Sequence, residues 1–384
     1  PQSPIPNPQS PIPIENNIFY KFLTQKRLNP FYYIFLYKKM EKKFIFFVFL
    51  SILLNSFLCE NIERKPLVKD LYTADPSAHV FNGKIYIYPS HDEDKDNEIN
   101  DNGDQYDMKD YHVYEMTDLE TYPKDLGAVL KLEDIKWASK QVWAPDCVEK
   151  DGKYYFVFPA RDKEGMFRIG IAKGDNPGGP FTPEPNYIKG SYSIDPCMFP
   201  DTDGKYYMSF GGLWGGQLDQ YRNNQWDESN KEPKGSEPAL NPKIALMKDN
   251  LLEFAEDPKD LVIVDENGNP LTGGDEERRY FEGPWIFKKD DTYYFTYSTG
   301  TTHKVCYATS KNIYGPYTYK GVILTPVLGW TTHHSILQFN GKWILFYHDC
   351  ERSNGVDNKR NIKFTYLEFD EFGNIKTIDG GLNK

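Results

Sequence analysis

The 384-residue chain is long enough for one large all-β domain or for two or three smaller domains. Hydrophobic residues make up 39% and charged residues 26%, which argues against wholesale disorder. The net charge of −11 argues against nucleic acid or an anionic membrane as the main partner, because both attract a basic surface. Aromatic residues, at 16%, favour strands and sugar-binding surfaces over helical bundles.

The first part of the chain is predicted to lie outside the folded domain. Residues 1–39 begin with a repeated Pro/Ser/Gln pattern, which predicts an unstructured low-complexity leader. Residues 40–59 combine a basic start at Met40, an apolar run from Phe44 to Leu54 and a polar end, which is typical of a secretory signal peptide. The run is short for a membrane span of about 20 residues, although an uncleaved anchor and a buried strand stay as alternatives. We therefore expect a secreted, extracellular protein with no membrane attachment in its mature form.

Four cysteines follow the predicted signal segment, and their spacing fits no zinc motif. Four cysteines allow three disulfide pairings, and free buried thiols are an equal alternative. These cysteines are Cys147, Cys197, Cys306 and Cys350.

A hairpin pattern recurs five times in the rest of the chain. Each copy has a two-residue turn followed by an aromatic strand, as in Asn82-Gly83 before Lys84–Tyr88. Asn-Gly and Asp-Gly are strong hairpin signals, because a type I′ turn needs a positive φ angle at both residues. The five turns are Asn82-Gly83, Asp151-Gly152, Asp203-Gly204, the weaker Asp290-Asp291, and Asn340-Gly341.

The spacing of these turns predicts the fold class. The shortest intervals are about 50 residues, which holds four short strands, or one propeller blade. The longer intervals leave room for loops at residues 91–110 and within residues 213–280, and no stretch shows sustained helical periodicity. We predict an all-β, five-bladed β-propeller over residues 68–384, with a β-sandwich or an unrelated set of hairpins as alternatives. The two long segments are expected to wall off one end of the axis and to favour a pocket.

Each repeat also carries an ionisable residue six to nine positions ahead of its turn. If the strand before each hairpin is the innermost of its blade, these side chains meet at one end of the axis. A single Asp beside Pro is usually a turn or cap residue, but four carboxylates crowded at one rim have no structural purpose and shift one another's pKa values. Such a set indicates acid–base chemistry. Its members are Asp75, Asp146, Asp195, Glu282 and His333.

Two carboxyl groups with separated pKa values near aromatic residues indicate glycoside hydrolysis. One carboxyl protonates the leaving oxygen, while the other attacks the sugar carbon or activates water. Aromatic faces stack on sugar rings, and Trp143, Trp214 and Trp285 are the candidates, each of which is equally compatible with a core position. Asp146 is assigned to substrate binding together with these tryptophans.

Several motifs resemble those of glycoside hydrolase family 43 across residues 68–384. The matching segments are Thr73–Ser77, Tyr88–Asp92, Val142–Asp146, Ser193–Pro196, Tyr280–Trp285 and Thr332–Ile336. The resemblance implies a five-bladed propeller enzyme that inverts the anomeric centre. It further implies that Asp75 is the general base that activates water and that Glu282 is the general acid. Asp195 is then the residue that raises the pKa of the acid and orients it.

The same resemblance implies two further site residues. His333 is expected to bind a calcium or similar ion through water, in preference to His334, with a hydrogen-bonded structural histidine as the alternative. An arginine of a late strand is expected in the sugar pocket, and Arg360 is preferred to Arg352 for this position.

These observations predict an exo-acting β-xylosidase of short xylo-oligosaccharides or of arabinose-decorated xylan. An α-L-arabinofuranosidase or arabinanase of the same family is the alternative. A non-catalytic carbohydrate-binding propeller is a different class, against which the presence of all three carboxylates argues. Propeller families that act on fructose units with retention usually begin with Asn-Asp-Pro-Asn, where this chain has Thr-Ala-Asp-Pro-Ser at residues 73–77. The expected partner is an oligosaccharide or polysaccharide substrate.

Overall fold

The computed structural model describes residues 61–382, which form one unit built almost wholly from strands. The predicted leader (residues 1–39) and the predicted signal segment (residues 40–59) lie outside the described residues. Within residues 61–382, no helix is long and apolar enough to cross a bilayer. The helical elements of this unit are the short 3₁₀ turns η1 (Leu132–Asp134), η2 (Trp214–Gly216), η3 (Leu218–Gln220) and η4 (Glu351–Ser353).

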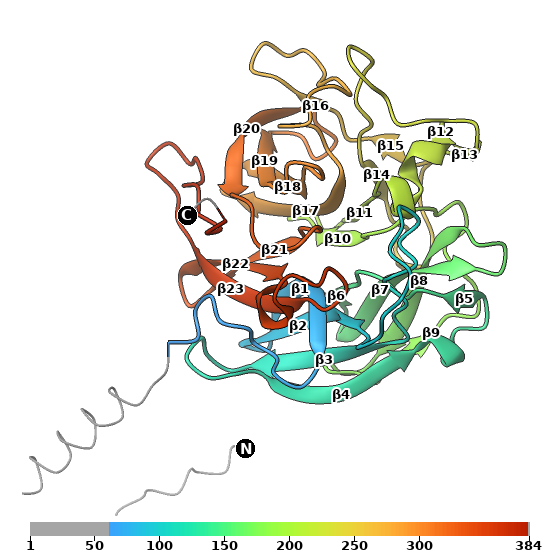
Figure 1. The fold of residues 1–384 in the computed structure, drawn as a ribbon, viewed down its shortest axis with the longest axis vertical. Helices are drawn as coiled ribbons and strands as arrows, with labels where there is room; N and C mark the ends of the chain where they lie inside the picture. Colours follow the sequence, from blue (N-terminus) through green and yellow to red (C-terminus); the bar gives the residue numbers. More distant parts are fainter. Residues whose placement is uncertain (1–60, 383–384) are drawn as a thin grey trace, which may run out of the picture. The chain divides into compact units, whose positions relative to one another are not determined.

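The strands form successive antiparallel sheets around an axis (Figure 1). The first sheet contains β1 (Tyr72–Phe81), β2 (Lys84–Asp92), β3 (Asp110–Met116) and β4 (Lys124–Lys131). The second contains β5 (Ala138–Lys140), β6 (Asp146–Lys150), β7 (Lys153–Asp162), β8 (Phe167–Gly174) and β9 (Thr182–Pro183). The third contains β10 (Cys197–Pro200), β11 (Tyr206–Phe210), β14 (Lys243–Leu246) and β15 (Lys259–Asp260), with a separate hairpin of β12 (Tyr221–Arg222) and β13 (Gln225–Trp226).

Two more sheets complete the ring. The fourth contains β17 (Glu282–Lys289), β18 (Thr292–Ser298), β19 (Val305–Ser310) and β20 (Tyr317–Leu324), with β16 (Ile263–Val264) added in parallel to β20. The fifth contains β21 (His334–Phe339), β22 (Lys342–Asp349) and β23 (Asn361–Leu367). The first strand of each hairpin lies innermost, because β1, β6, β10, β17 and β21 contact one another in that order and β21 contacts β1. The predicted five-bladed propeller is confirmed.

The start of the described chain closes the ring against its end. The backbone N–H groups of Arg64 and Leu67 donate hydrogen bonds to the carbonyls of Phe364 and Ile362 on β23, at 2.8 and 2.9 Å. The N–H of Thr73 likewise donates to the carbonyl just ahead of β23. These bonds satisfy the free edge of the three-stranded fifth sheet. They also hold β1, which carries Asp75, against the segment that leads into β23 and carries Arg360.

The predicted hairpin turns form, with one exception. Both residues have positive φ angles in Asn82-Gly83 (52° and 75°), and the same holds for the second and fifth copies. The third copy is different: Pro200 pairs with Tyr206, and the N–H of Asp201 donates to the carbonyl of Lys205, so the loop is longer than two residues. Gly204, at 82°, takes the left-handed position that ends such a loop.

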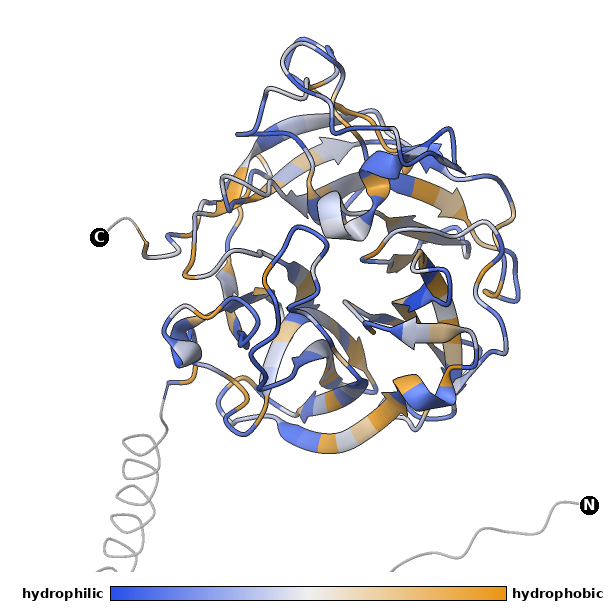
Figure 2. Ribbon diagram, turned by 45° about the vertical axis from the view of Figure 1, so that its right-hand side comes forward, coloured by the Kyte–Doolittle hydropathy of each residue, from blue (hydrophilic) through white to orange (hydrophobic). Residues whose placement is uncertain are grey.

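Aromatic residues of the strands fill the space between neighbouring blades. Between the first two blades, the rings of Tyr111 and Phe156 meet at 5.0 Å, and Phe156 also contacts Tyr88 at 5.9 Å. All three rings are fully buried, and burial of a Phe-sized side chain contributes about 1.5–3 kcal/mol. Hydrophobic residues follow the strands, whereas the loops are largely hydrophilic (Figure 2). The high aromatic content therefore serves the core first.

The structure shows whether the four cysteines of the described residues are paired or free. All four are buried and free, so none of them forms a disulfide. They are Cys147, Cys197, Cys306 and Cys350.

Candidate functional site

A cavity of about 430 Å³ opens at one end of the propeller axis. Its lining includes the three carboxylates Asp75, Asp195 and Glu282, which come from three different blades. Residues of the 91–110 segment and of the 213–280 segment contribute to the wall, as predicted. The sequence-based expectation that these carboxylates share one sugar-sized cavity is therefore met.

Proline-containing bulges aim two of the carboxylates at the axis. On β1, Asp75-Pro76 lie opposite a single residue of β2, because the register shifts between Ala74 and Ser77. On β17, the same shift occurs beside Glu282, at Gly283-Pro284. Proline has no N–H to donate to the ladder, and such bulges re-aim neighbouring side chains.

The backbone at these carboxylates is strained. Asp75 has a φ angle of 49° and Asp195 one of 55°, which is the left-handed region that costs a non-glycine residue about 1 kcal/mol or more. Gly283 takes the corresponding position beside Glu282, with a φ angle of 63°. A Cβ atom there would lie 3.2 Å from the His333 ring. The N–H of Gly283 donates to Oδ2 of Asp195 at 2.9 Å, which ties the third blade to the fourth.

Asp75 is held as an ionised carboxylate. Oδ1 accepts a hydrogen bond from Nη1 of Arg360 at 3.0 Å, and Oδ2 accepts one from the hydroxyl of Ser90 at 2.6 Å. Burial alone would raise its pKa, but the charge of Arg360, with smaller contributions from His348 and His333, lowers the pKa to about 2. Such a group is ready to accept a proton from a bound water.

His348 holds the backbone of Asp75 in place. The N–H of Asp75 donates to Nδ1 of His348 at 3.0 Å, and Nε2 of that ring lies 3.0 Å from the carbonyl of Thr331. Burial and the charge of Arg360 lower the pKa of His348 to about 3, so the imidazole is neutral. With Nδ1 accepting, the proton sits on Nε2 and is donated to Thr331.

Arg360 lies in the cavity wall, as predicted, and its guanidinium is fully engaged. Nε and Nη2 donate to the two oxygens of Asp92 at 2.8 Å each, while Nη1 reaches Asp75. The guanidinium also lies over the Tyr106 ring, 4.7 Å from its centre. Its rival Arg352 instead donates to the carbonyl of Leu71, outside the cavity lining. The bidentate pair with Asp92 fixes the arginine in the orientation that serves Asp75.

Glu282 has the opposite electrostatic character to Asp75. Burial, followed by the negative charge of Asp75, raises the pKa of Glu282 to about 8, against a smaller opposing effect of Arg360. Glu282 is nevertheless half-buried as a residue and lines the cavity. Glu282 thus carries a proton at neutral pH and can deliver it to a ligand in the cavity.

The pKa of Asp195 is shifted in the same direction as that of Glu282. Burial, with the charges of Glu282 and Asp75, raises its pKa well above the usual range. Both carboxyls are buried in one cavity and their pKa values shift upward together. The role of Asp195 in raising the pKa of the acid stays a prediction. Its orienting contact is the hydrogen bond from the backbone of Gly283.

His333 lines the cavity with two unsatisfied nitrogens. The ring is buried, neither Nδ1 nor Nε2 has a hydrogen-bond partner, and Nε2 lies 3.8 Å from Oδ2 of Asp195. His334, in contrast, contacts the hydroxyl of Thr296 at 2.6 Å through Nε2 and lies outside the cavity lining. The orphaned nitrogens of His333 fit a water molecule or a hydrated ion. Calcium prefers oxygen ligands, so a calcium ion here would contact the ring through water.

Two of the predicted tryptophans line the cavity. Nε1 of Trp143 donates to the carbonyl of Tyr106 at 2.8 Å, and Trp214 stacks on Trp330 with ring centres 5.7 Å apart and planes 17° apart. Hydrogen bonds and stacking hold both rings, so the cavity lining includes rigid aromatic surface.

Asp146 and Trp285 do not line the cavity, which corrects their assignment to substrate binding. Each follows a proline, whereas Asp75 and Asp195 precede one, so they lie further along their strands. Oδ2 of Asp146 accepts the N–H of Met198 at 2.6 Å, and its Oδ1 contacts Ser77 and His79. Nε1 of Trp285 donates to the carbonyl of Ile336 at 3.0 Å, and its ring packs 5.2 Å from His79. Both residues tie neighbouring blades together.

The sequence reading missed several residues that complete the site. Ser90 and Asp92 flank His91 in the Tyr88–Asp92 motif, which resembles the family. The motif by itself does not indicate what these two side chains do. Others come from loops whose course only the structure gives. These loop residues include Tyr106, Trp330 and Thr331.

Comparison with known proteins finds a family match over most of the chain. The family model "Glycosyl hydrolases family 43" matches residues 64–374. The chain is 56% identical to a xylosidase/arabinosidase of Bacteroides ovatus and 57% identical to xylosidase/arabinosidase 43A of Humicola insolens. These alignments cover 83% and 81% of this chain, and 98% of each relative.

A solved structure is similarly close. It is a GH43 beta-xylosidase/alpha-arabinofuranosidase from a compost microbial metagenome, in complex with xylotriose and in a calcium-free form. It is 54% identical with a TM-score of 0.82, and the match covers 84% of this chain and 98% of that one. On the family match and these relatives, the chain belongs to glycosyl hydrolase family 43.

Proposed function

We propose that this protein is an inverting exo-glycosidase that acts as a β-xylosidase on short xylo-oligosaccharides. The observation that carries the proposal is the opposite protonation of two carboxyls in one cavity. Asp75 has a pKa of about 2 and Glu282 one of about 8, so between these values one is a base and the other an acid. Separated pKa values of this kind are what acid–base hydrolysis of a glycoside requires.

The reaction follows from these protonation states. The proton of Glu282 passes to the glycosidic oxygen as the bond to the sugar carbon breaks. A water on the other side of the ring attacks that carbon and gives its proton to Asp75. Arg360 and Ser90 hold the carboxylate of Asp75 in place, and Asp195 orients the segment around Glu282 through the Gly283 backbone. Water attack in one step inverts the anomeric centre.

Support for the sugar comes from the relatives. Their names include xylosidase, arabinosidase and beta-xylosidase, and the metagenome structure holds xylotriose. The cavity is walled by two long segments, which favours recognition of a chain end over the middle of a polymer. The α-L-arabinofuranosidase reading is the second candidate, because relatives that align over most of the chain carry both activities in their names.

His333 is the residue we propose for calcium. Its unpartnered nitrogens fit a hydrated ion, and the description of the metagenome structure as calcium-free makes calcium the first ion to test. When bound, such an ion supplies positive charge at the end of the axis.

We further propose that residues 40–59 direct the chain out of the cell. N-terminal sequencing of protein from the medium tests this, and intact residues 40–59 in that protein would contradict it.

Hydrolysis of matched substrates tests the function. We expect release of the aryl group from an aryl β-xyloside and of xylose from xylobiose, with a higher kcat/KM for the β-xyloside than for the aryl α-arabinofuranoside. A higher value for the arabinofuranoside would select the second candidate. Binding of xylotriose without hydrolysis of any of these substrates would instead identify a carbohydrate-binding propeller and end the enzyme proposal.

A further inference from the structure

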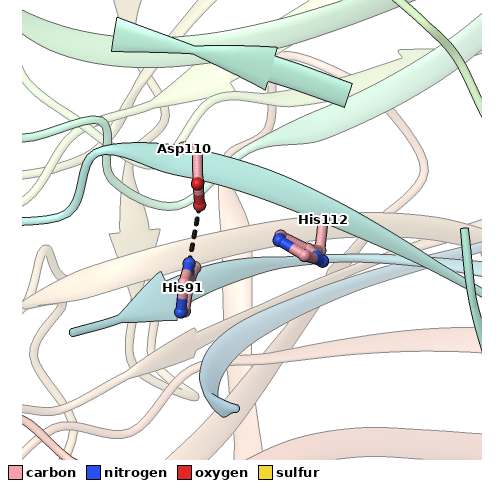
Figure 3. Close-up of side chains that lie close together, drawn as sticks. All are labelled: His91, Asp110 and His112. Atoms are coloured by element: carbon pink, nitrogen blue, oxygen red, sulfur yellow. Dashed lines mark hydrogen bonds and ion pairs between the residues drawn. The ribbon is translucent and has the colours of Figure 1, made fainter. Parts of the chain in front are cut away.

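Two histidines and an aspartate meet on the first blade, in a cluster that the proposed mechanism does not use (Figure 3). His91 lies near the end of β2, while Asp110 and His112 lie at the start of β3. Asp110 and His112 are two positions apart on one strand, so their side chains share a face. One potential ligand atom of each residue lies within 4.8 Å of the others. None of the three residues lines the cavity.

The three side chains of the cluster are partly exposed to solvent and partly buried. The side chains of His91 and Asp110 are 18% and 25% exposed, and that of His112 is 16% exposed. An ion can therefore reach them from solvent, while the surrounding strands restrict their rotamers. Both strands belong to the sheet of the first blade, and ligands carried by strands are placed more accurately than ligands on a loop.

The contacts already present resemble those around a bound metal. Nδ1 of His91 lies 2.6 Å from Oδ1 of Asp110. Nδ1 of His112 contacts the carboxylate of Asp125 on β4 at 3.0 and 3.1 Å, and the other ring nitrogen is turned toward the His91–Asp110 pair in Figure 3. A carboxylate on the far nitrogen of a histidine fixes the tautomer and orients the ring toward a metal.

The donor set selects a class of ion. Imidazole and carboxylate donors suit zinc, copper and nickel, whereas calcium requires six to eight oxygens. Around tetrahedral zinc with bonds of about 2.0–2.1 Å, ligand atoms lie about 3.3 Å apart. The 2.6 Å contact between His91 and Asp110 would open by less than about 1 Å, and His112 would move inward. Side-chain rotations of this size need no change of the backbone.

We propose that His91, Asp110 and His112 form a binding site for a divalent transition-metal ion, with zinc as the reference ion and water as the fourth ligand. Asp125 acts through His112 as a positioning residue. The site is separate in position and in ligand chemistry from the one assigned to His333. The ion would join β2 to β3, and β2 also carries Ser90 and Asp92. Those two side chains point to the opposite face of the strand and hold Asp75 and Arg360.

Titration of the metal-stripped full chain with zinc chloride tests the site. We expect the wild type to bind zinc and the His112→Ala variant to bind one equivalent less in calorimetry. The visible spectrum of added cobalt should show tetrahedral coordination only in the wild type. Asp125→Asn should weaken zinc binding about 10- to 100-fold. Zinc should raise the melting temperature of the wild type more than that of His112→Ala, because a ligand of the native state stabilises it.

Two variants keep the test specific. His333→Ala should retain this zinc equivalent, which separates the cluster from the cavity and from the proposed glycosidase. His112 is a better target than His91, since His91 stands between two residues that hold the site. Asp110→Asn provides a second ligand variant if His112→Ala does not fold. Equal zinc stoichiometry and affinity in the wild type and in both ligand variants, or no zinc binding by the wild type, would overturn the proposal.

Discussion

The pKa of Glu282 should set the alkaline limit of activity. At pH 7, a carboxyl with a pKa of about 8 is about 90% protonated, whereas one at the ordinary value of 4.5 is about 0.3% protonated. The environment of Glu282 therefore increases the amount of usable acid about 300-fold. We expect kcat/KM on xylobiose to fall about tenfold per pH unit above pH 8, because only the protonated form can assist departure of a sugar.

Replacement of Glu282 by Gln should abolish the fall in kcat/KM above pH 8. Its effect on kcat/KM should also depend on the leaving group of the substrate. Xylobiose and aryl xylosides with poor leaving groups need the proton, so their kcat/KM should fall about 10²- to 10⁴-fold. An activated dinitrophenyl xyloside should lose less than about tenfold. Its remaining activity should no longer fall above pH 8.

Steady-state kinetics across pH 5–10 with both substrates makes the measurement. Glu115→Gln is a suitable control, because Glu115 forms a surface ion pair with Lys84 on the first blade and does not line the cavity. This control should keep the pH profile of the wild type. Equal losses on both substrates, or an alkaline limb near pH 8 that persists in Glu282→Gln, would refute the assignment of Glu282 as the acid.

Three further outcomes follow from the site. Arg360→Gln should raise the pKa of Asp75, since it removes the positive charge that lowers this pKa, and the acidic limb of kcat/KM should move to higher pH; an unmoved limb would contradict this. Gly283→Ala should lower the free energy of unfolding in urea by at least about 1 kcal/mol, because alanine is strained at a φ angle of 63°, and an unchanged midpoint would contradict it. Trp330→Ala should raise KM about two- to tenfold with less effect on kcat, since it removes the partner that stacks on Trp214, and a loss confined to kcat would contradict that role.

Much of the architecture was predictable because it repeats. Asn-Gly or Asp-Gly turns with positive φ angles mark three of the five hairpins, and the strand ahead of each turn lies at the axis as expected. Asp75, Asp195 and Glu282 could be grouped because they recur at similar distances from these turns. The length of the third turn was predicted wrongly, since Asp203-Gly204 looks the same in sequence whether the loop holds two residues or more.

The errors arose where one position along a strand decides the outcome. Asp146 and Trp285 occur in the same motifs as the cavity residues, but they follow the proline and so contact neighbouring blades. The charge relations were also hidden, since burial is the main cause that raises the pKa values of Glu282 and Asp195, and burial depends on the fold. Trp330 and Tyr106 lie in loops without a periodic pattern, and nothing local indicates that they reach the cavity.

The anomeric form of the first sugar released tests the central claim most directly. If Asp75 activates a water that attacks the sugar carbon, proton NMR recorded immediately after adding enzyme to an aryl β-xyloside should show α-xylose first. The β-anomer should then grow only by mutarotation. Appearance of β-xylose first would mean that a carboxylate attacks the sugar itself, and the division of roles between Asp75 and Glu282 would be wrong.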